Sequence, residues 1–305
     1  MEHRNAIADY LDIDLLARLS DLEFRAAFLV DGFLSGIHAS PFRGRSVEFR
    51  EHRNYHPGDE VSAIDWKAYA RTDRLHVRTH EAETNLNAHI LLDRSGSMNF
   101  RGPGARMSKW EYARSVAAAL LLFLLRQQDA AALTLAGGEY SPGGKPSATE
   151  SGFRRQLARL AGEAGDRDSD WPSVLAELAQ ELRPRSVVIL ISDFYVEPAV
   201  LAPAFDLFRG KNCEILLLHV IDPAEEEFPG SETQLLEECE TGERLLLNPE
   251  LIRESCMKAF REHAAALAEL AGSRGGEYLP LRTDRVMLEL FGAYLRLRAG
   301  RGRRR

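Results

Sequence analysis

From residue 88 onward, short apolar segments alternate with longer amphipathic ones, and this alternation constrains the fold more than any other feature. The short segments are apolar on both faces, which is typical of strands buried in a parallel sheet. We predict strands at 88–93, 131–136, 186–193, 213–221 and 277–281. We predict helices around 108–127, 172–182, 198–208, 249–271 and 284–298. Strands and helices that alternate in this way predict an α/β fold, a doubly wound, mostly parallel sheet with helices on both faces.

The first 86 residues follow a different pattern. Apolar residues recur at helical spacing between residues 10 and 35, which predicts an amphipathic helix or a helix pair. Between residues 41 and 86, short alternating segments flank an HPGD turn, which predicts a small, charged, strand-rich unit. We therefore divide the chain into an N-terminal helical segment (1–40), a charged β-rich unit (41–86), an α/β domain (87–299) and a basic tail (300–305).

Composition limits the classes of function. The chain has a formal charge of −7 although six arginines lie in its last ten residues, so the rest is more acidic still and a general nucleic-acid binder is not expected. Its three scattered cysteines form no C-x-x-C, which fits a reducing compartment. The start lacks a secretory pattern, and the longest apolar run, 116–125, is about half the length of a membrane span. We expect a cytoplasmic protein.

Side chains with oxygen atoms come directly after the predicted strands. Asp93, Ser95 and Ser97 lie at alternate positions after the first strand, Asp193 ends a later strand, and Ser169 precedes the helix before that strand. Ligands of such sheets lie beyond the carboxyl ends of the strands, and hard oxygen donors suit Mg²⁺, Mn²⁺ or Ca²⁺. We predict that these five residues bind a divalent cation, most simply Mg²⁺. Because Asp and Ser are also common helix caps and turn formers, a purely structural role stays open.

These motifs resemble a known family. The D-x-S-x-S after the first strand, the hydroxyl before the middle helix and the later Asp resemble the metal-ion-dependent adhesion site of von Willebrand factor A domains. The segment EFREHRNYHPGDEVSAIDWKAYARTDRLHVRTHEAETN (48–85), which runs into LLDRSGSM, is similar to the signature of the bacterial "domain of unknown function 58" family. Residues 238–260 and 277–298 are similar to it as well. The resemblance implies a von Willebrand A-like fold with an N-terminal helical segment and a small β-rich insertion.

The resemblance also implies a role for each matching residue. Ser95 and Ser97 would bind the metal directly, Asp93 and Asp193 would bind it directly or through water, and Ser169 stands where the pattern usually has Thr. In the wider fold, an acidic side chain of a partner fills the open coordination position, so the implied function is that of a non-catalytic, metal-dependent adaptor. Family members resemble companions of MoxR-type AAA+ ATPases. The implied partner is such an ATPase or its client protein.

Within the charged unit, five residues match the most characteristic block of the family. They are Arg50, Arg53, Asp65, Trp66 and Arg71. Aspartate and tryptophan beside several arginines indicate either ion pairs that anchor this unit to the main domain or a partner-binding face, and both interpretations stay open.

Two other functions stay open. The ending RLRAGRGRRR could contact anionic lipid, which would make the chain a membrane-surface binding module recruited by its tail. Ser95 or Ser97 could be the nucleophile of a serine hydrolase, although no G-x-S-x-G surrounds them. The sequence contains no Walker A loop and no H-E-x-x-H, and nucleotide hydrolysis is not expected.

Overall fold

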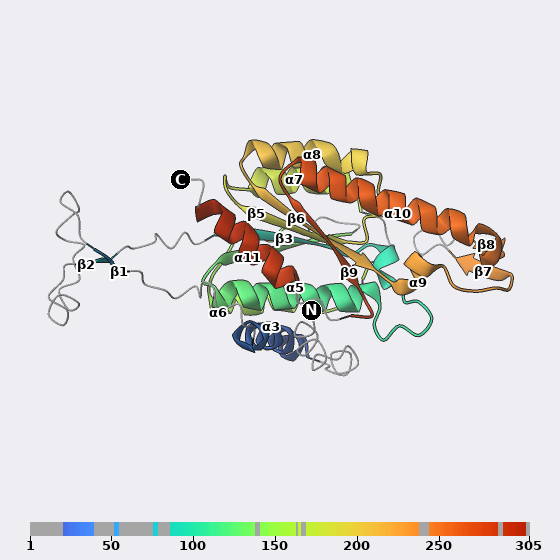
Figure 1. Ribbon diagram of the computed structural model, residues 1–305, viewed down its shortest axis with the longest axis horizontal. Coiled ribbons are helices and arrows are strands. Elements are labelled where there is room, and N and C mark those ends of the chain that lie inside the picture. Colours follow the sequence, from blue (N-terminus) through green and yellow to red (C-terminus); the bar gives the residue numbers. More distant parts are fainter. Residues whose placement is uncertain are drawn as a thin grey trace. The chain divides into compact units, whose positions relative to one another are not determined.

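The computed structural model describes residues 21–39, 52–54, 76–78, 86–137, 141–162, 164–165, 169–237, 244–285 and 289–302. The chain forms two compact units (Figure 1). The larger unit comprises Met1–Ser35 and Leu86–Arg305, and the smaller one comprises Gly36–Asn85.

A five-stranded parallel sheet is the centre of the larger unit. Its strands are β3 (Asn87–Asp93), β4 (Ala130–Ala136), β5 (Val187–Ser192), β6 (Glu214–Ile221) and β9 (Glu277–Arg282). They lie in the order β4-β3-β5-β6-β9, and every neighbouring pair is parallel. The five predicted strands are confirmed, and each bound differs from the prediction by at most one residue. Because β3 pairs with β4 on one side and β5 on the other, the topological switch point lies between β3 and β5.

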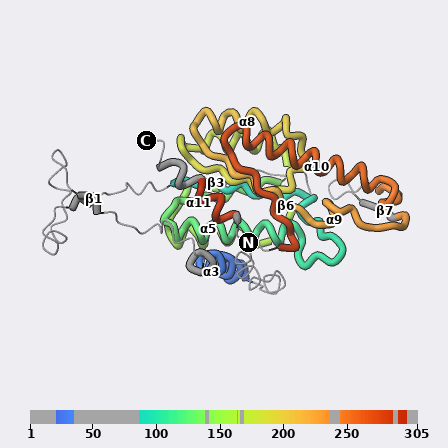
Figure 2. The backbone as a smooth tube through the Cα atoms, in the orientation of Figure 1, coloured from blue at the N-terminus to red at the C-terminus, as the bar shows by residue number. Residues whose placement is uncertain are grey.

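Helices cover both faces of this sheet (Figure 2). One apolar core lies under α3 (Leu22–Ala39), α5 (Lys109–Arg126), α6 (Glu150–Arg159) and α11 (Glu289–Gly302). The other lies under α7 (Trp171–Glu181), α8 (Pro198–Gly210) and α10 (Pro249–Ser273). The predicted α/β class, a doubly wound, mostly parallel sheet with helices on both faces, is confirmed in this architecture. In the part of the chain that the structure describes, no helix is both long and apolar enough to cross a membrane.

The helix predictions hold for four of the five helices and fail in part for the last one. The bounds of α5, α7, α8 and α10 differ from the predicted ranges by at most two residues. Residues 283–285 form a turn after β9, where the prediction began the last helix at 284. A backbone hydrogen bond from Thr283 N to the Ile221 carbonyl (2.9 Å) holds the start of this turn beside β6, which keeps it out of a helix.

Helix α3 packs as part of the larger unit. Ala26, Leu29 and Val30 are buried in the same core as α5, and the Phe33 ring contacts Phe123 edge-on, with 5.7 Å between the centroids. The prediction placed helical structure at 10–35, and the described helix begins at Leu22. The part of that prediction before residue 21 lies outside the described residues.

The smaller unit contains an antiparallel pair of short strands, β1 (His52–Asn54) and β2 (His76–Arg78), with Arg53 opposite Val77. Of the candidate residues in this unit, Arg53 lies in β1, and only its backbone is described. Arg50, Asp65, Trp66 and Arg71 lie outside the described residues.

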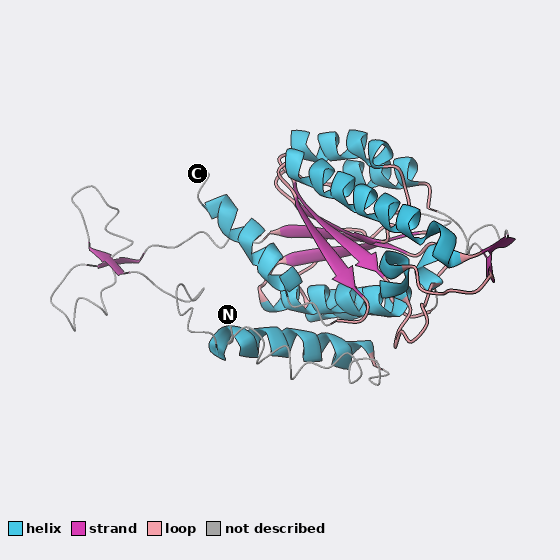
Figure 3. Cartoon of the chain, turned by 45° about the vertical axis from the view of Figure 1, so that its right-hand side comes forward, coloured by secondary structure: helices cyan, strands magenta, loops and turns pink. Residues whose placement is uncertain are grey.

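A short helix and a hairpin, neither predicted from the sequence, separate β6 from α10. The helix is α9 (Pro223–Glu227), and the hairpin strands are β7 (Gln234–Glu237) and β8 (Arg244–Leu247), which pair antiparallel. In Figure 3 the hairpin projects from the end of the unit at which α10 begins. Each strand is only four residues long, too short for a periodicity that a sequence window can detect.

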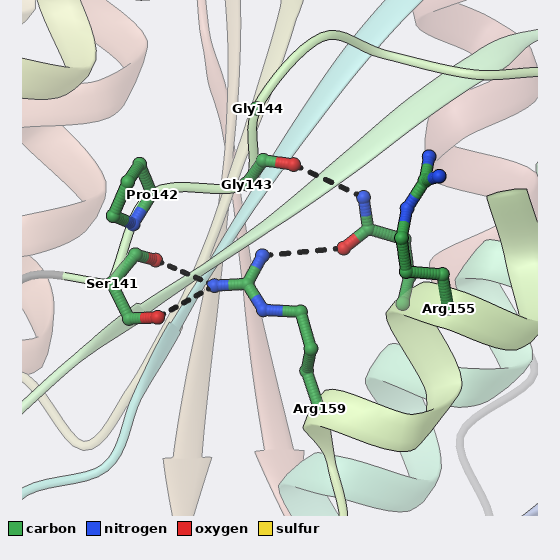
Figure 4. A pocket seen from close by; sticks show the side chains of 7 residues that line it. Ser141, Pro142, Gly143, Gly144, Arg155 and Arg159 are labelled. Atoms are coloured by element: carbon green, nitrogen blue, oxygen red, sulfur yellow. Dashed lines mark hydrogen bonds between the residues drawn. The ribbon is translucent and has the colours of Figure 1, made fainter.

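The free edge of β4 is covered by residues 141–147, which meet it antiparallel at Leu135–Ser141 and Ala131–Ser147. A pocket of about 440 Å³ lies here, between this segment and α6. The Arg159 guanidinium lines it and donates to the carbonyl (2.7 Å) and the hydroxyl (2.8 Å) of Ser141 (Figure 4). Because these hydrogen bonds go to the segment that covers β4, Arg159 helps to hold this segment against the edge of the sheet.

Candidate metal centre

The Asp93 carboxylate is the centre of a buried cluster at the switch point. Asp93 is the last residue of β3 and is 2% exposed. Its Oδ1 accepts hydrogen bonds from the Ser95 backbone N–H (3.0 Å) and the Ser169 hydroxyl (2.9 Å). Its Oδ2 accepts one from the Ser192 hydroxyl (2.6 Å). Three loops at the carboxyl edge of the sheet therefore converge on one carboxylate.

The two serines after Asp93 lie next to each other. Ser95 caps a short 3₁₀ helix, η3 (Gly96–Asn99), and its Oγ is 3.1 Å from the Oγ of Ser97. The loop is braced from β4, because the Arg94 N–H donates to the Ala136 carbonyl (2.5 Å). Gly137, with φ 138°, comes next in the chain, and a Cβ there would lie 2.7 Å from the Arg94 carbonyl carbon. Only glycine lets the two loops approach this closely.

Asp193 comes directly after β5 and pairs with a buried ammonium group. Its Oδ2 is 2.6 Å from Nζ of Lys109, the first residue of α5, and the lysine side chain is 0% exposed. The second partner of Lys109 is Oε1 of Glu225 on α9, at 2.5 Å. A cation at a helix N-terminus opposes the helix dipole, so these two carboxylates are what stabilise it there.

The pKa values of the cluster reflect burial and the closeness of its charged groups. Burial, and then the neighbouring Asp193 carboxylate, raise the pKa of Asp93 to about 6. Burial also raises the pKa of Glu225. Burial by itself would lower the pKa of Lys109, but Asp193 and Glu225 outweigh it and raise that pKa.

The donor set and the charge fit one divalent cation. Asp193 and Glu225 both pair with the Lys109 ammonium group, and the buried Asp93 carboxylate lies close enough to Asp193 for their charges to interact. These four groups together have two more negative charges than positive ones. Carboxylate and hydroxyl oxygens are the ligands that Mg²⁺ prefers. No group of three or more His, Cys, Asp or Glu side chains is arranged to hold a metal anywhere in the described ranges, so a metal here would depend on the serine hydroxyls.

The turn after Asp193 is held in a strained conformation. Phe194 has φ 49°, a left-handed conformation that costs a bulky residue about 1–2 kcal/mol. Its N–H donates to the Ser192 hydroxyl (2.8 Å), and its carbonyl lies 2.8 Å from Nε2 of His263 on α10. The next residue, Tyr195, is 56% exposed, and its ring centroid is 4.8 Å from the Lys109 ammonium. The turn thus presents an aromatic ring at the rim of the cluster.

The structure brings four of the five predicted ligands, Asp93, Ser95, Ser97 and Ser169, into one hydrogen-bonded network. Asp193 adjoins it, and its carboxylate acts on the pKa of Asp93 while its hydrogen bond goes to Lys109.

Sequence reasoning missed three members of the cluster, Ser192, Lys109 and Glu225. Ser192 could have been found from the sequence, because its hydroxyl comes directly before Asp193. Lys109 and Glu225 could not, because a lysine at a helix start and a glutamate in an acidic run are ordinarily solvated.

The fold and the cluster define a class of protein: a doubly wound α/β domain with a carboxylate–hydroxyl cluster at its switch point. The comparison with protein families is more specific. The family model described as "Protein of unknown function DUF58" matches residues 51–266, and the chain belongs to this family.

Two relatives found by sequence are each described as an "Uncharacterized protein". Mb1516 of Mycobacterium bovis is 28% identical over 285 residues, which cover 92% of this chain and 88% of the relative. YeaD of Bacillus subtilis is 34% identical over 87 residues, 28% of this chain and 19% of that protein.

Solved structures are similar at a coarse level. An aerotolerance-related membrane protein of Bacteroides fragilis is 14% identical, with a TM-score of 0.48 over 70% of this chain and 99% of that one. BatB of Bacteroides thetaiotaomicron is 15% identical, with a TM-score of 0.45 over 70% and 98%. The SpRpn10 VWA domain is 12% identical, with a TM-score of 0.38 over 65% and 88%.

Proposed function

We propose that this protein is a non-catalytic, metal-dependent adaptor that binds an acidic side chain of another protein. Asp93, Ser95, Ser97, Ser169 and Asp193 would hold Mg²⁺, or the related Mn²⁺ or Ca²⁺. The bound ion would supply an electrophilic position for a carboxylate of the partner. The observation that carries the proposal is the buried excess of two negative charges beside neutral hydroxyl donors at the switch point.

The chain's own residues prepare this site. Three hydrogen bonds hold the Asp93 carboxylate in one orientation. The serine hydroxyls are neutral ligands, so they add no negative charge to that of the carboxylates and repel an incoming acid less than further carboxylates would. Lys109 engages Oδ2 of Asp193, which reduces the charge that this aspartate presents to the cluster.

The family resemblance indicates the partner. We propose a MoxR-type AAA+ ATPase, or the client that it remodels, with an acidic residue exposed for docking, and we place the protein in the cytoplasm with it. The exposed Tyr195 ring beside the cluster is a contact that a docking partner would cover.

A pull-down tests the proposal. The tagged full chain should retain the ATPase or client from its native cell in Mg²⁺ and release it in EDTA. Asp93→Ala should abolish retention, while Asp206→Ala, which removes an exposed carboxylate paired with Arg274 on the surface, should not. Equal retention with and without EDTA would rule out the metal-bridged mechanism. Far-ultraviolet circular dichroism of both variants checks that the fold is intact.

A further inference from the structure

The hairpin between α9 and α10 exposes leucines that nothing in the described chain covers. Leu235 on β7, Leu245 and Leu246 on β8 and Leu251 on α10 are 59%, 62%, 68% and 82% exposed. Four of the seven large hydrophobic residues that are exposed among the described residues thus belong to one stretch of chain. We call residues 234–251, without the undescribed 238–243, the leucine arm.

The pairing of the strands puts leucines on both faces of the arm. Leu235 lies opposite Leu246, and Leu245, the residue before Leu246 on β8, faces the other way because side chains alternate along a strand. A two-stranded hairpin is only marginally stable by itself in water. A hairpin that also leaves a cross-strand leucine pair in water has the properties of a surface that a partner covers.

The surroundings of the leucines are strongly acidic. Residues 228–254, which leave out the glutamates paired with Lys109 and Arg282, contain seven Glu and two Arg, an excess of five negative charges. Glu232, Glu250 and Glu254 are exposed. One of the two arginines, Arg253, is half-buried and donates to the Phe228 carbonyl (3.0 Å).

We propose that the leucine arm docks a basic amphipathic segment of a partner protein. Apolar side chains of that segment would cover Leu235 and Leu246, and its Lys or Arg side chains would face the surrounding glutamates. Charge complementarity selects this occupant, because a second copy of the arm or an anionic lipid surface would bring like charges together. The arm is separate from the metal centre, so this docking requires no divalent cation.

A peptide-binding measurement tests the apolar part. The probe is a fluorescein-labelled 18-residue helical peptide with leucines on one face and lysines on the other, titrated with the full-length protein in EDTA. Leu235→Ser/Leu246→Ser should weaken peptide binding about tenfold or more, because the variant lacks the two leucine side chains that the bound peptide would bury. The matched control is Leu207→Ser, which changes a leucine on α8 that is 54% exposed, and it should leave binding unchanged.

Charge reversal tests the electrostatic part. Glu232→Lys/Glu254→Lys should weaken binding and reduce its salt dependence, whereas Glu177→Lys/Glu269→Lys, at exposed positions on α7 and α10 outside the acidic segment, should do so much less. Equal binding by the leucine-to-serine variant, or by a peptide with glutamates in place of lysines, would overturn the proposal. The proposal would also be overturned if the wild-type chain self-associates in sedimentation and Leu235→Ser/Leu246→Ser abolishes this self-association, since the occupant would then be a second copy. If retention of the ATPase or client is the same with and without EDTA while the labelled peptide still binds, the proposed function alone is refuted.

Discussion

Replacing Asp93 with asparagine should separate the electrostatic cost of the cluster from its capacity to bind a cation. Burial and the neighbouring Asp193 carboxylate raise the pKa of Asp93 from 3.8 to about 6. At pH 8 the ionised carboxylate therefore destabilises the folded protein, and at about 1.4 kcal/mol for each tenfold change in the ionisation constant the cost is about 3 kcal/mol. Asparagine removes the charge and keeps the shape. Its amide nitrogen cannot accept a hydrogen bond, which costs about 1 kcal/mol. Without metal, Asp93→Asn should be more stable than wild type by about 2 kcal/mol.

Urea unfolding followed by tryptophan fluorescence at pH 8 measures this difference. In EDTA the variant should unfold at the higher urea concentration. Mg²⁺ at one hundred times its dissociation constant should then stabilise the wild type by about 2.7 kcal/mol and the variant by much less, so that the order reverses. Glu177→Gln, which neutralises an exposed carboxylate on α7, should leave both curves unchanged.

Two results would refute this reasoning. If Asp93→Asn is clearly less stable than wild type in EDTA, the carboxylate is not a repulsive charge in the folded protein. If Mg²⁺ stabilises the variant as much as the wild type, the cation binds somewhere else.

Three further perturbations test other parts of the molecule. Lys109→Met should destabilise the protein by about 3–5 kcal/mol in urea unfolding, because it leaves the carboxylates of Asp193 and Glu225 without their partner. A smaller loss of stability in Lys109→Met/Glu225→Gln would support this cause, and an equal loss of stability would argue against it. Gly137→Ala should lower the melting temperature and reduce the stabilisation by Mg²⁺, since a Cβ would collide with the Arg94 backbone, whereas Gly210→Ala, where nothing lies within 4 Å, should do neither. His89 is buried with neither ring nitrogen hydrogen-bonded in the described structure, and burial followed by the Arg183 charge lowers its pKa to about 4. Its contribution to stability is complete above pH 6.5, and about 3 kcal/mol should be lost as the pH falls from 6.5 to 4. His89→Leu should flatten that part of a pH series of urea midpoints, and an unchanged slope would show that other groups cause it.

The sheet was predictable because its signals are local. Strands buried on both faces must be apolar throughout, so runs such as VVILIS in β5 stand out against the amphipathic helices between them. The α6 and α9 helices and the β7–β8 hairpin were not predicted. The hairpin strands are short and Leu235, Leu245 and Leu246 are exposed, so burial imposes no periodicity on them.

The candidate ligands were also accessible from sequence, because the carboxyl ends of parallel strands meet at one edge. Asp93 ends β3 with Ser95 and Ser97 just beyond it, and Asp193 comes directly after β5. The counter-charges were not accessible. Lys109 is separated from Asp193 by 84 positions and from Glu225 by 116, and no window contains both members of either pair.

The amino-acid sequence alone determined the α/β class, the strands and the chemical type of the candidate site, since these depend on side-chain periodicity and on the residue types at the strand ends. Only the tertiary structure determined the net charge of that site and the pKa values of its groups. Folding buries Lys109 against Asp193 and Glu225, and buries Asp93 nearby, and thereby sets how much negative charge a bound cation would neutralise. Burial and the closeness of distant segments arise from packing, which cannot be deduced from the order of residue types along the chain.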